Sequence, residues 1–266
     1  GETFRPIAIL GRLLLVSSCR IALPFLEKSI PNMFSRTTLL YGDERMARIR
    51  SAHVLVVGTG GVGAYAAEML CRAGVGHLTL VDADTVSPSN INRQLPALHS
   101  TLGRSKVSVL AERFRDINPE VQLTLREEYL TPESVDALLD AAPYAYVIDA
   151  IDTIQPKVAL LAACIRRRQP VIASMGAGAK TDITAIQYAD LWQTYHCGLS
   201  KSVRNGLARA GLRGRKLPVV FCTQQVDRNA LLTVEGERNK KTTAGTVSFM
   251  PATFGNYLAA WVLNHL

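Results

Sequence analysis

The sequence lacks paired cysteines. No two of its five cysteines form a C-x-x-C pair; they stand at Cys19, Cys71, Cys164, Cys197 and Cys222. Structural zinc sites and secreted disulfide frameworks depend on regular cysteine spacing, so the sequence indicates neither. We therefore expect reduced thiols and a cytoplasmic protein.

Long apolar runs are also missing. No stretch of eighteen uncharged apolar residues occurs, because Arg12 and Arg20 interrupt the apolar N-terminal segment, so we expect no membrane-spanning helix. Residues 1–32 differ in composition from the rest of the chain, and two interpretations stay open: a targeting peptide, or an extension of unknown role that precedes a natural start at Met33. The fold argument uses residues 33–266.

Acidic residues are outnumbered. The chain has 22 Asp and Glu against 30 Lys and Arg, which gives a net charge of +8. Such an excess suggests a polyanionic partner, although many basic enzymes bind no nucleic acid. A length of 266 residues with 48% hydrophobic residues is enough to bury the core of one large α/β domain, or of one domain with an appendage.

From His53 onward, short β-branched runs alternate with helical stretches. We predict strands at 53–57, 77–82, 121–127, 145–150 and 170–174, with helices over 62–73, 104–117, from Pro132 onward, and 155–168. Thr131 is the expected N-cap of the helix that starts at Pro132. This alternation predicts an α/β fold with a mostly parallel sheet. After Ser174 the rhythm loosens into a second lobe, which ends in a strand-like run and an apolar helix.

A glycine-rich turn follows the first strand. Gly58, Gly60 and Gly63 fit G-x-G-x-x-G between a strand and a helix, and Asp82 closes the second strand. Backbone N–H groups at such a turn bind phosphate, and the acid binds ribose hydroxyls, so NAD and ATP both fit. No G-x-x-x-x-G-K-[ST] motif is present, which excludes an ordinary P-loop ATPase.

The loop after the acid distinguishes the two nucleotides. It carries polar residues and leads into the next helix; they are Asp84, Asn90, Arg93, Gln94 and Lys106. A triphosphate needs cations around its outer phosphates, and Arg93 and Lys106 are candidates. The alternative is a solvated loop with ordinary surface charges.

Four motifs together resemble the ubiquitin-activating-enzyme-like adenylating superfamily, whose bacterial members include MoeB and ThiF. They are "GGVGAYAAEMLCRAGVGHLTLVDADTVSPSNINRQ", "LGRSK", "INPE" and "VIDAIDT", colinear over residues 34–175. The resemblance implies a Rossmann-like doubly wound sheet, ATP and Mg²⁺ as cofactors, and a homodimer. It implies a nucleotide-binding part at 33–175 and a part at 176–266 that binds substrate or tRNA.

Site residues follow from the same resemblance. The phosphates are expected to lie against four glycines, namely Gly58, Gly60, Gly61 and Gly63. Asp82 would bind the ribose with Asp84 beside it, while Asn90, Arg93 and Lys106 would contact the triphosphate. Asp152 would orient Mg²⁺, and a partner subunit would contribute Arg36. Asp149 lies at the same strand end, either beside the ligand or as a helix-capping carboxylate.

The second half resembles one branch, the tRNA threonylcarbamoyladenosine dehydratases. Superfamily members that activate carrier proteins usually have two C-x-x-C pairs, which this chain lacks. Cys197 and Cys222 are either nucleophiles or buried small side chains. One departure from the branch is Cys222-Thr223-Gln224, which stands where an acidic residue is often found.

The resemblance implies an ATP-dependent cyclisation. ATP would convert the carboxylate of threonylcarbamoyladenosine, next to the tRNA anticodon, into an acyl-adenylate, and the neighbouring carbamoyl group would close a ring. The alternatives are adenylation of a sulfur-carrier or ubiquitin-like protein, an NAD-dependent oxidoreductase, and a nucleotide-sensing module. A sulfur-transfer protein is a further expected partner.

Basic residues cluster in the second half. The expected tRNA contacts are Lys201, Arg204, Arg209, Arg213, Arg215 and Lys216, because this stretch has little acidic compensation. Two further groups are Arg166, Arg167 and Arg168, and Arg238, Lys240 and Lys241. The arginine triplet has an equal alternative as a solvated helix end that complements the helix dipole.

Overall fold

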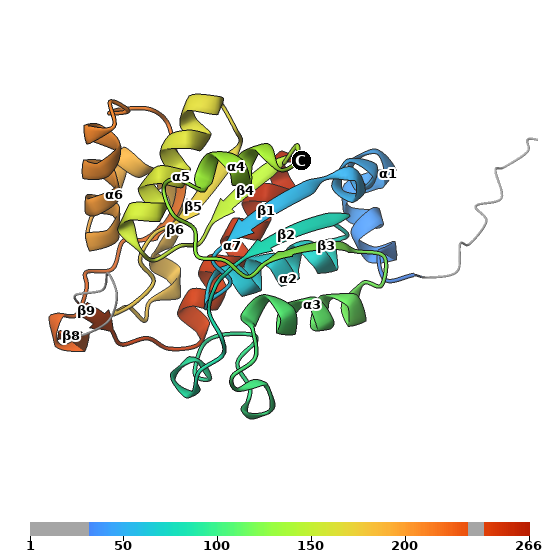
Figure 1. The fold of residues 1–266 in the computed structure, drawn as a ribbon, viewed down its shortest axis with the longest axis horizontal. Coiled ribbons are helices and arrows are strands. Elements are labelled where there is room, and N and C mark those ends of the chain that lie inside the picture. Colours follow the sequence, from blue (N-terminus) through green and yellow to red (C-terminus); the bar gives the residue numbers. More distant parts are fainter. Residues whose placement is uncertain (1–31, 234–241) are drawn as a thin grey trace, which may run out of the picture. The chain divides into compact units, whose positions relative to one another are not determined.

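The structure, a computed structural model, describes residues 32–233 and 242–266 (Figure 1). Residues 1–31 of the N-terminal extension and the basic residues Arg238, Lys240 and Lys241 lie outside the described residues. Within the described part, none of the helices is both long and apolar enough to cross a membrane.

A seven-stranded sheet forms the centre of the fold. Its strands are β1 (His53–Val57), β2 (His77–Val81), β3 (Gln122–Arg126), β4 (Tyr146–Asp149), β5 (Val171–Ser174), β6 (Ile186–Asp190) and β7 (Pro218–Cys222). The spatial order is β3-β2-β1-β4-β5-β7-β6. Every neighbouring pair is parallel except β6 and β7. The predicted mostly parallel α/β fold is confirmed.

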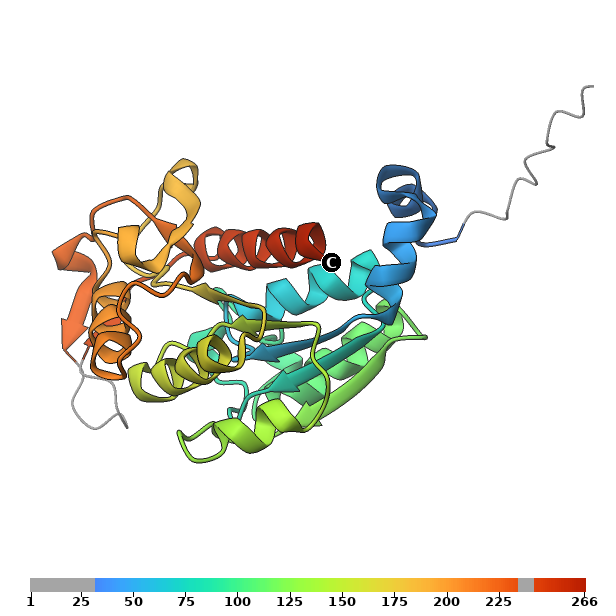
Figure 2. The ribbon, with the colours of Figure 1, turned by 90° about the horizontal axis from the view of Figure 1, so that it is seen from above.

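Helices cover both faces of this sheet (Figure 2). One core contains residues of α1 (Ser35–Ser51), α2 (Gly63–Ala73), α3 (Lys106–Ile117) and α7 (Phe249–His265). The other contains residues of α4 (Val135–Asp140), α5 (Ile154–Arg167) and α6 (Gly198–Arg209). The near-continuous apolar strands are explained by this arrangement, because parallel strands are buried on both faces.

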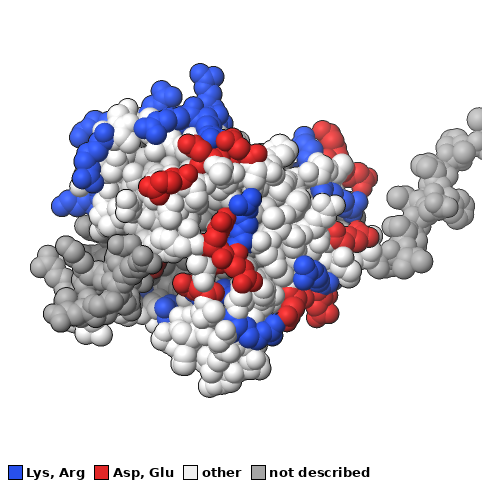
Figure 3. Space-filling view, viewed as in Figure 1, with Lys and Arg blue, Asp and Glu red and all other residues white. Residues whose placement is uncertain are grey.

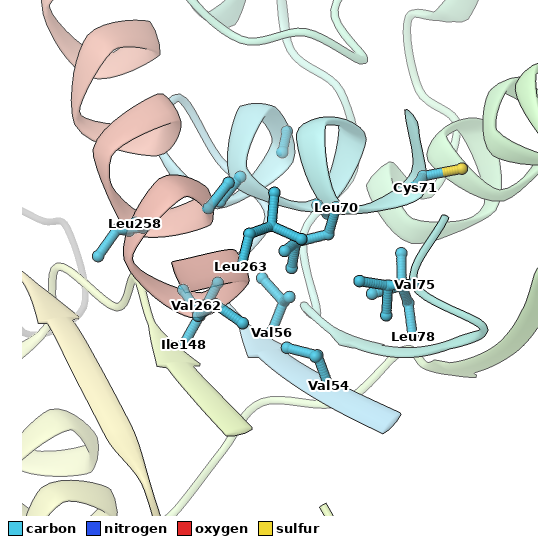
Figure 4. Close-up of a cluster of buried hydrophobic side chains, with 14 of the residues drawn as sticks. Val54, Val56, Leu70, Cys71, Val75, Leu78, Ile148, Leu258, Val262 and Leu263 are labelled. Carbon is cyan, nitrogen blue, oxygen red and sulfur yellow. The ribbon is translucent and has the colours of Figure 1, made fainter. Parts of the chain in front are cut away.

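The packing of α7 against α2 holds the region after β1 in place. Gly255 of α7 lies so close to α2 that a Cβ there would stand 2.5 Å from the carbonyl oxygen of Val62. Around this contact, Leu258, Val262 and Leu263 of α7 gather with buried side chains from β1, α2 and β4 (Figure 4). The start of α2 is therefore fixed by the closing helix of the chain.

One expectation needs correction. The third predicted helix begins at Val135 rather than Pro132, and Thr131 is not its N-cap. The Ser134 hydroxyl instead donates to the Thr131 carbonyl and accepts from the Thr131 N–H, which closes a separate turn before the helix. The part of the chain expected as a second lobe, residues 176–266, contributes β6 and β7 to the same sheet. Only β8 (Leu231–Thr233) and β9 (Thr242–Ala244) form a separate two-stranded sheet among the described residues.

Candidate active site

The candidate site lies at the carboxyl ends of β1, β2 and β4. The chain runs from β1 to β2 on one side and later returns to place β4 on the other side of β1. Doubly wound sheets bind ligands at this point of reversal, where crossovers on opposite faces leave a crevice. Gly58 follows β1, Asp82 follows β2 and Asp152 follows β4, so the structure brings the predicted loops together.

The glycines of the turn are required for different reasons. Gly58 has a φ of +85°, and a Cβ there would stand 2.9 Å from the Ala150 carbonyl oxygen. A Cβ on Gly63 would stand 1.8 Å from the Gly58 carbonyl oxygen, and one on Gly61 would stand 3.2 Å from Pro251. At Gly60 the nearest atom would be the Gln94 Nε2, 3.6 Å away. Gly58 and Gly63 therefore have no room for a side chain, whereas a Cβ at Gly60 would make an ordinary contact with Gln94.

Asp82 organises the same turn. Its Oδ2 accepts hydrogen bonds from the Thr59 N–H at 2.7 Å and the Thr59 hydroxyl at 3.1 Å. Its Oδ1 accepts from the Asp84 N–H at 2.9 Å. One carboxylate thus ties the end of β2 to the glycine turn after β1.

Lys106 and Asp84 form an ion pair across the loop that follows β2. The Lys106 Nζ lies 2.7 Å from the Asp84 Oδ2. Lys106 is only 4% exposed, whereas the Asp84 side chain is 69% exposed. A buried ammonium group therefore stands at the start of α3, and its ion-pair partner is a solvent-facing carboxylate.

Arg93 and Asn90 make contacts within their own loop. The Arg93 Nη1 donates to the Ser89 carbonyl at 2.7 Å and to the Asn92 Oδ1 at 2.8 Å. The Asn90 Oδ1 accepts from the Ser87 N–H at 3.2 Å. In this conformation both side chains serve the loop itself, and binding a nucleotide through Arg93 requires its guanidinium to exchange these partners.

The two aspartates after β4 have different surroundings. Asp149 is fully buried, with its Oδ2 2.7 Å from the Lys157 Nζ, and its Oδ1 accepts from the Ile151 N–H at 3.0 Å. Burial raises the pKa of Asp149, and the positive charge of Lys157 opposes that rise. Asp152 is exposed, just before Thr153, the N-cap of α5. Asp149 is therefore an internal anchor rather than a helix cap, whereas Asp152 lies at the surface at the same strand end.

Sequence reasoning missed Lys157. Its Nζ also donates to the Ile151 carbonyl at 3.0 Å, so one side chain fixes both the end of β4 and the loop that carries Asp152. The signal was a lone lysine directly before the apolar run "VALLAAC". Charged residues are almost never fully buried unless paired, so a partner was to be expected.

Arg36 is not close to the glycine turn of its own chain. It is exposed near the start of α1, and the preceding Phe34 ring lies against Gly74, where a Cβ would stand 3.0 Å from the ring. Gly74 ends α2 and leads to the amino end of β2, whereas the glycine turn lies at the carboxyl end of β1. Figure 2 shows α1 at the end of the sheet away from β8 and β9.

Most of the predicted tRNA contacts lie on the surface. Lys and Arg side chains gather on the side of the molecule where α6 lies (Figure 3). The exposed members are Lys201, Arg209, Arg213, Arg215 and Lys216. Arg168 lines an open pocket of about 560 Å³ together with Arg215 and Lys216. Arg167 instead forms ion pairs with Asp136 and Asp140 on α4.

Arg204 has a structural role. Its Nη1 donates to the carbonyl oxygens of Leu191 at 3.3 Å and Thr194 at 2.9 Å, and also contacts the Thr194 hydroxyl. These bonds hold the segment before α6, so the side chain is occupied within the protein in this conformation.

The four described cysteines, Cys71, Cys164, Cys197 and Cys222, are all buried. The Cys197 Sγ accepts from the Ser200 N–H at 3.5 Å at the start of α6. The Cys222 Sγ donates to the Asp182 carbonyl at 3.7 Å. These contacts are those of small interior side chains.

Gln224, part of the departure from the family branch, holds a neighbouring loop. Its Oε1 accepts from the Thr181 N–H at 2.8 Å and the Asp182 N–H at 2.9 Å. An amide oxygen therefore satisfies two backbone donors at the position where an acidic residue was expected.

Comparison with known proteins identifies relatives along the whole described fold. The ThiF family model matches residues 34–266. A tRNA threonylcarbamoyladenosine dehydratase of Escherichia coli is 44% identical over 174 residues, or 65% of each chain. One of Haemophilus influenzae is 37% identical over 236 residues, which cover 85% of this chain and 90% of that protein.

A solved structure also resembles this chain, in both sequence and fold. The crystal structure of E. coli tRNA N6-threonylcarbamoyladenosine dehydratase, TcdA, in complex with ATP, is 36% identical with a TM-score of 0.79. It covers 88% of this chain, which in turn covers 93% of that one. The glycine turn, the acid after β2 and the matched length lead to one conclusion: the chain belongs to the ThiF family.

Proposed function

We propose that this protein is an ATP-dependent tRNA threonylcarbamoyladenosine dehydratase. The observation that carries the proposal is the glycine turn at the reversal point of the sheet, in which Gly58 and Gly63 have no room for a side chain. Relatives named tRNA threonylcarbamoyladenosine dehydratase match the chain, and the solved TcdA structure was determined in complex with ATP.

The residues around the turn fit a nucleotide. A Cβ at Gly60 would occupy space over the N-terminal end of α2, where backbone N–H groups and the helix dipole favour phosphate. The Gln94 Oε1, beside Gly60, is buried and has no hydrogen-bond partner within residues 32–233 and 242–266. A ligand that donates a hydrogen bond at this point would satisfy it. Lys106 would bind an outer phosphate by giving up its ion pair with Asp84.

Mg²⁺ fits the same region in a specific way. No group of three or more His, Cys, Asp or Glu side chains in the described part of the chain could hold a metal ion by itself. Mg²⁺ is commonly bound by one or two carboxylates together with substrate phosphates, and Asp152 is exposed at the right strand end. When bound, Mg²⁺ would neutralise phosphate charge.

The proposed reaction has two steps. The threonyl carboxylate attacks the α-phosphorus of ATP, which forms an acyl-adenylate and releases pyrophosphate. An atom of the neighbouring carbamoyl group then attacks the activated carbonyl, AMP leaves, and a five-membered ring closes with net loss of water. Because the substrate supplies its own nucleophile, no catalytic thiol is needed. The buried positions of Cys197 and Cys222 agree with this.

Residues 33–175 supply the nucleotide contacts in this proposal, and residues 176–266 supply those to tRNA. Arg93 and Lys106 stabilise charge on the transferred phosphorus. Arg36 acts on the glycine turn of a second subunit, because it lies at the other end of the sheet in its own chain. The working unit is therefore a homodimer.

The decisive experiment uses tRNA that carries threonylcarbamoyladenosine. Incubation with ATP and Mg²⁺ is expected to release pyrophosphate and AMP, with loss of one water from the modified nucleoside by mass spectrometry. Asp152→Ala and Arg93→Ala should abolish this release while leaving the fold intact, and Arg115→Ala, an exposed arginine on α3, is the control. Near-normal turnover in either site variant would contradict the assignment.

The rival activity is separated by the same assay. Pyrophosphate release that requires a small carrier protein ending in Gly-Gly, with none from modified tRNA, would identify a carrier-activating enzyme instead. Binding of NAD without affinity for ATP would point to an oxidoreductase.

A further inference from the structure

Two exposed rings stand at the carboxyl end of β7. Tyr195 and His196 belong to the segment that joins a short helix, η4 (Leu191–Gln193), to α6. Tyr195 is 48% exposed, and His196 is exposed as well. Their ring centroids lie 5.0 Å apart with an interplanar angle of 84°. A pair of exposed rings in edge-to-face contact offers aromatic surface to a ligand.

The two rings are held in place. Tyr195 packs edge-on against Phe221, a buried residue of β7, with centroids 5.5 Å apart. The His196 Nδ1 lies 3.0 Å from the Thr223 carbonyl oxygen, so Nδ1 carries a proton and donates to it. His196 also has a φ of +50°, a left-handed conformation that non-glycine residues adopt at a cost. These contacts therefore hold both rings of the segment in place.

This segment reaches the edge of the sheet where the glycine turn lies. Its next residue, Cys197, has its Sγ 3.4 Å from the position of a Cβ on Gly176, which follows β5. Thr223, the partner of His196, follows β7. The rings thus lie along the row of strand ends that begins with Asp82 after β2 and passes Asp152 after β4.

The substrate would lie along that row. β7 is the second strand beyond β4, and strands lie about 4.8 Å apart, so the ends of β4 and β7 are roughly 10 Å from each other. The arm from the adenine N6 to the threonyl carboxyl carbon spans roughly 5 Å when extended, by peptide-like bond lengths. The extended arm of a base held beside β7 therefore covers about half of that separation and can point its carboxylate along the row toward Asp152.

We propose that Tyr195 and His196 form a stacking platform for the modified adenine of the RNA substrate, a site that rests on the proposed function. Aromatic side chains recognise unstacked RNA bases by their faces, and alanine substitution of one such ring weakens binding about tenfold or more. Lys201, exposed in the first turn of α6, lies one turn beyond and binds a flanking phosphate.

The test measures binding of an anticodon stem-loop that carries threonylcarbamoyladenosine, by fluorescence anisotropy, so that it does not depend on turnover. Tyr195→Ala and His196→Asn are expected to raise Kd about tenfold each, with ATP affinity and Tm unchanged. Asn is chosen because it tolerates a positive φ. Tyr195→Phe should bind like the parent, and Tyr129→Ala, an exposed tyrosine after β3, is the matched control.

Salt dependence separates stacking from charge. Tyr195→Ala should leave the slope of log Kd against log salt unchanged, whereas Lys201→Ala should reduce it by about 1. Unchanged Kd in Tyr195→Ala, or a loss of ATP affinity and Tm along with it, would overturn the platform. Tight binding by the parent without pyrophosphate release would instead refute the proposed function and leave the platform standing.

Discussion

At the scale of single residues, the charge pattern and the contacts of a side chain carry different information. Lys201, Arg204 and Arg209 read alike in the sequence, as cations in one polar helix. Lys201 and Arg204 are three residues apart, a spacing that places two side chains on one face of a helix. Only the fold reveals that Arg204 meets the carbonyl oxygens of Leu191 and Thr194.

We predict that Arg204→Ala destabilises the protein by about 1–3 kcal/mol, because it removes the side-chain donor to the Thr194 carbonyl oxygen. Arg209→Ala should leave the free energy of unfolding within about 0.5 kcal/mol and weaken tRNA binding at low salt. Urea denaturation and filter binding measure the two effects. Equal stability of both variants would show that the Arg204 bonds contribute nothing.

Two other residue roles could not be predicted from the sequence. The ion-pair partner of Asp149 could not be predicted, because Lys157 contacts Asp149 only when α5 packs against the end of β4. Gln224 was noted as a departure, but the loop it holds, Thr181 and Asp182, lies about forty residues away in the chain. Long-range hydrogen bonds of this kind leave no periodic signal.

At the scale of elements, the first five strands and most of the helices between them were predictable. Each strand is a short β-branched run and each helix is amphipathic, and the strand order follows from crossovers in a parallel sheet. The order β5-β7-β6 was not predictable, because β7 inserts between β5 and the earlier β6. Likewise, the turn closed by Ser134 delayed the helix expected at Pro132.

The glycine turn gives a paired prediction. Gly63→Ala should destabilise the protein by about 3 kcal/mol or more, since its Cβ would stand 1.8 Å from the Gly58 carbonyl oxygen. Gly60→Ala should keep the Tm but reduce ATP affinity, because its Cβ enters the space left for phosphate. Thermal unfolding and ATP titration separate the two. Normal ATP affinity in Gly60→Ala would place the nucleotide elsewhere.

The amino ends of β1 and β2 predict a pH dependence. His53 stacks on His77 with ring centroids 3.6 Å apart. Desolvation and the neighbouring His77 lower the pKa of His53 to about 4, and desolvation lowers that of His77. The unfolded chain binds more protons between pH 6.5 and 4, so stability should fall as pH drops through this window. His53→Gln should flatten that part of the curve in urea titrations at several pH values.

The opposite slope, or a curve unchanged by His53→Gln, would show that the histidine pair does not govern this region. Asn264→Ala, at the far end of α7, serves as a control that alters an exposed polar contact without a titratable group.

At the scale of the whole molecule, the sheet separates functions by its two ends. The proposed nucleotide site and the ring platform lie at carboxyl ends of strands, whereas Arg36 lies on a helix that leads into an amino end. A site that needs Arg36 and Asp152 must then be assembled from two chains.

Mixing two inactive variants tests this arrangement. Arg36→Ala and Asp152→Ala should each lack activity, and subunit exchange between them should restore up to about a quarter of the parental rate, since half of the dimers are mixed and each mixed dimer has one intact site. Continued inactivity after verified exchange would mean that Arg36 acts within its own chain or not at all.

The interior placement of the described cysteines has a practical consequence. Burial raises the pKa of Cys71 to about 11 and that of Cys164 to about 12, which leaves almost no thiolate at neutral pH. An alkylating reagent would therefore modify these two sulfurs only when the chain opens around them. Their labelling rates would therefore report local unfolding of the two cores, one on each face of the sheet.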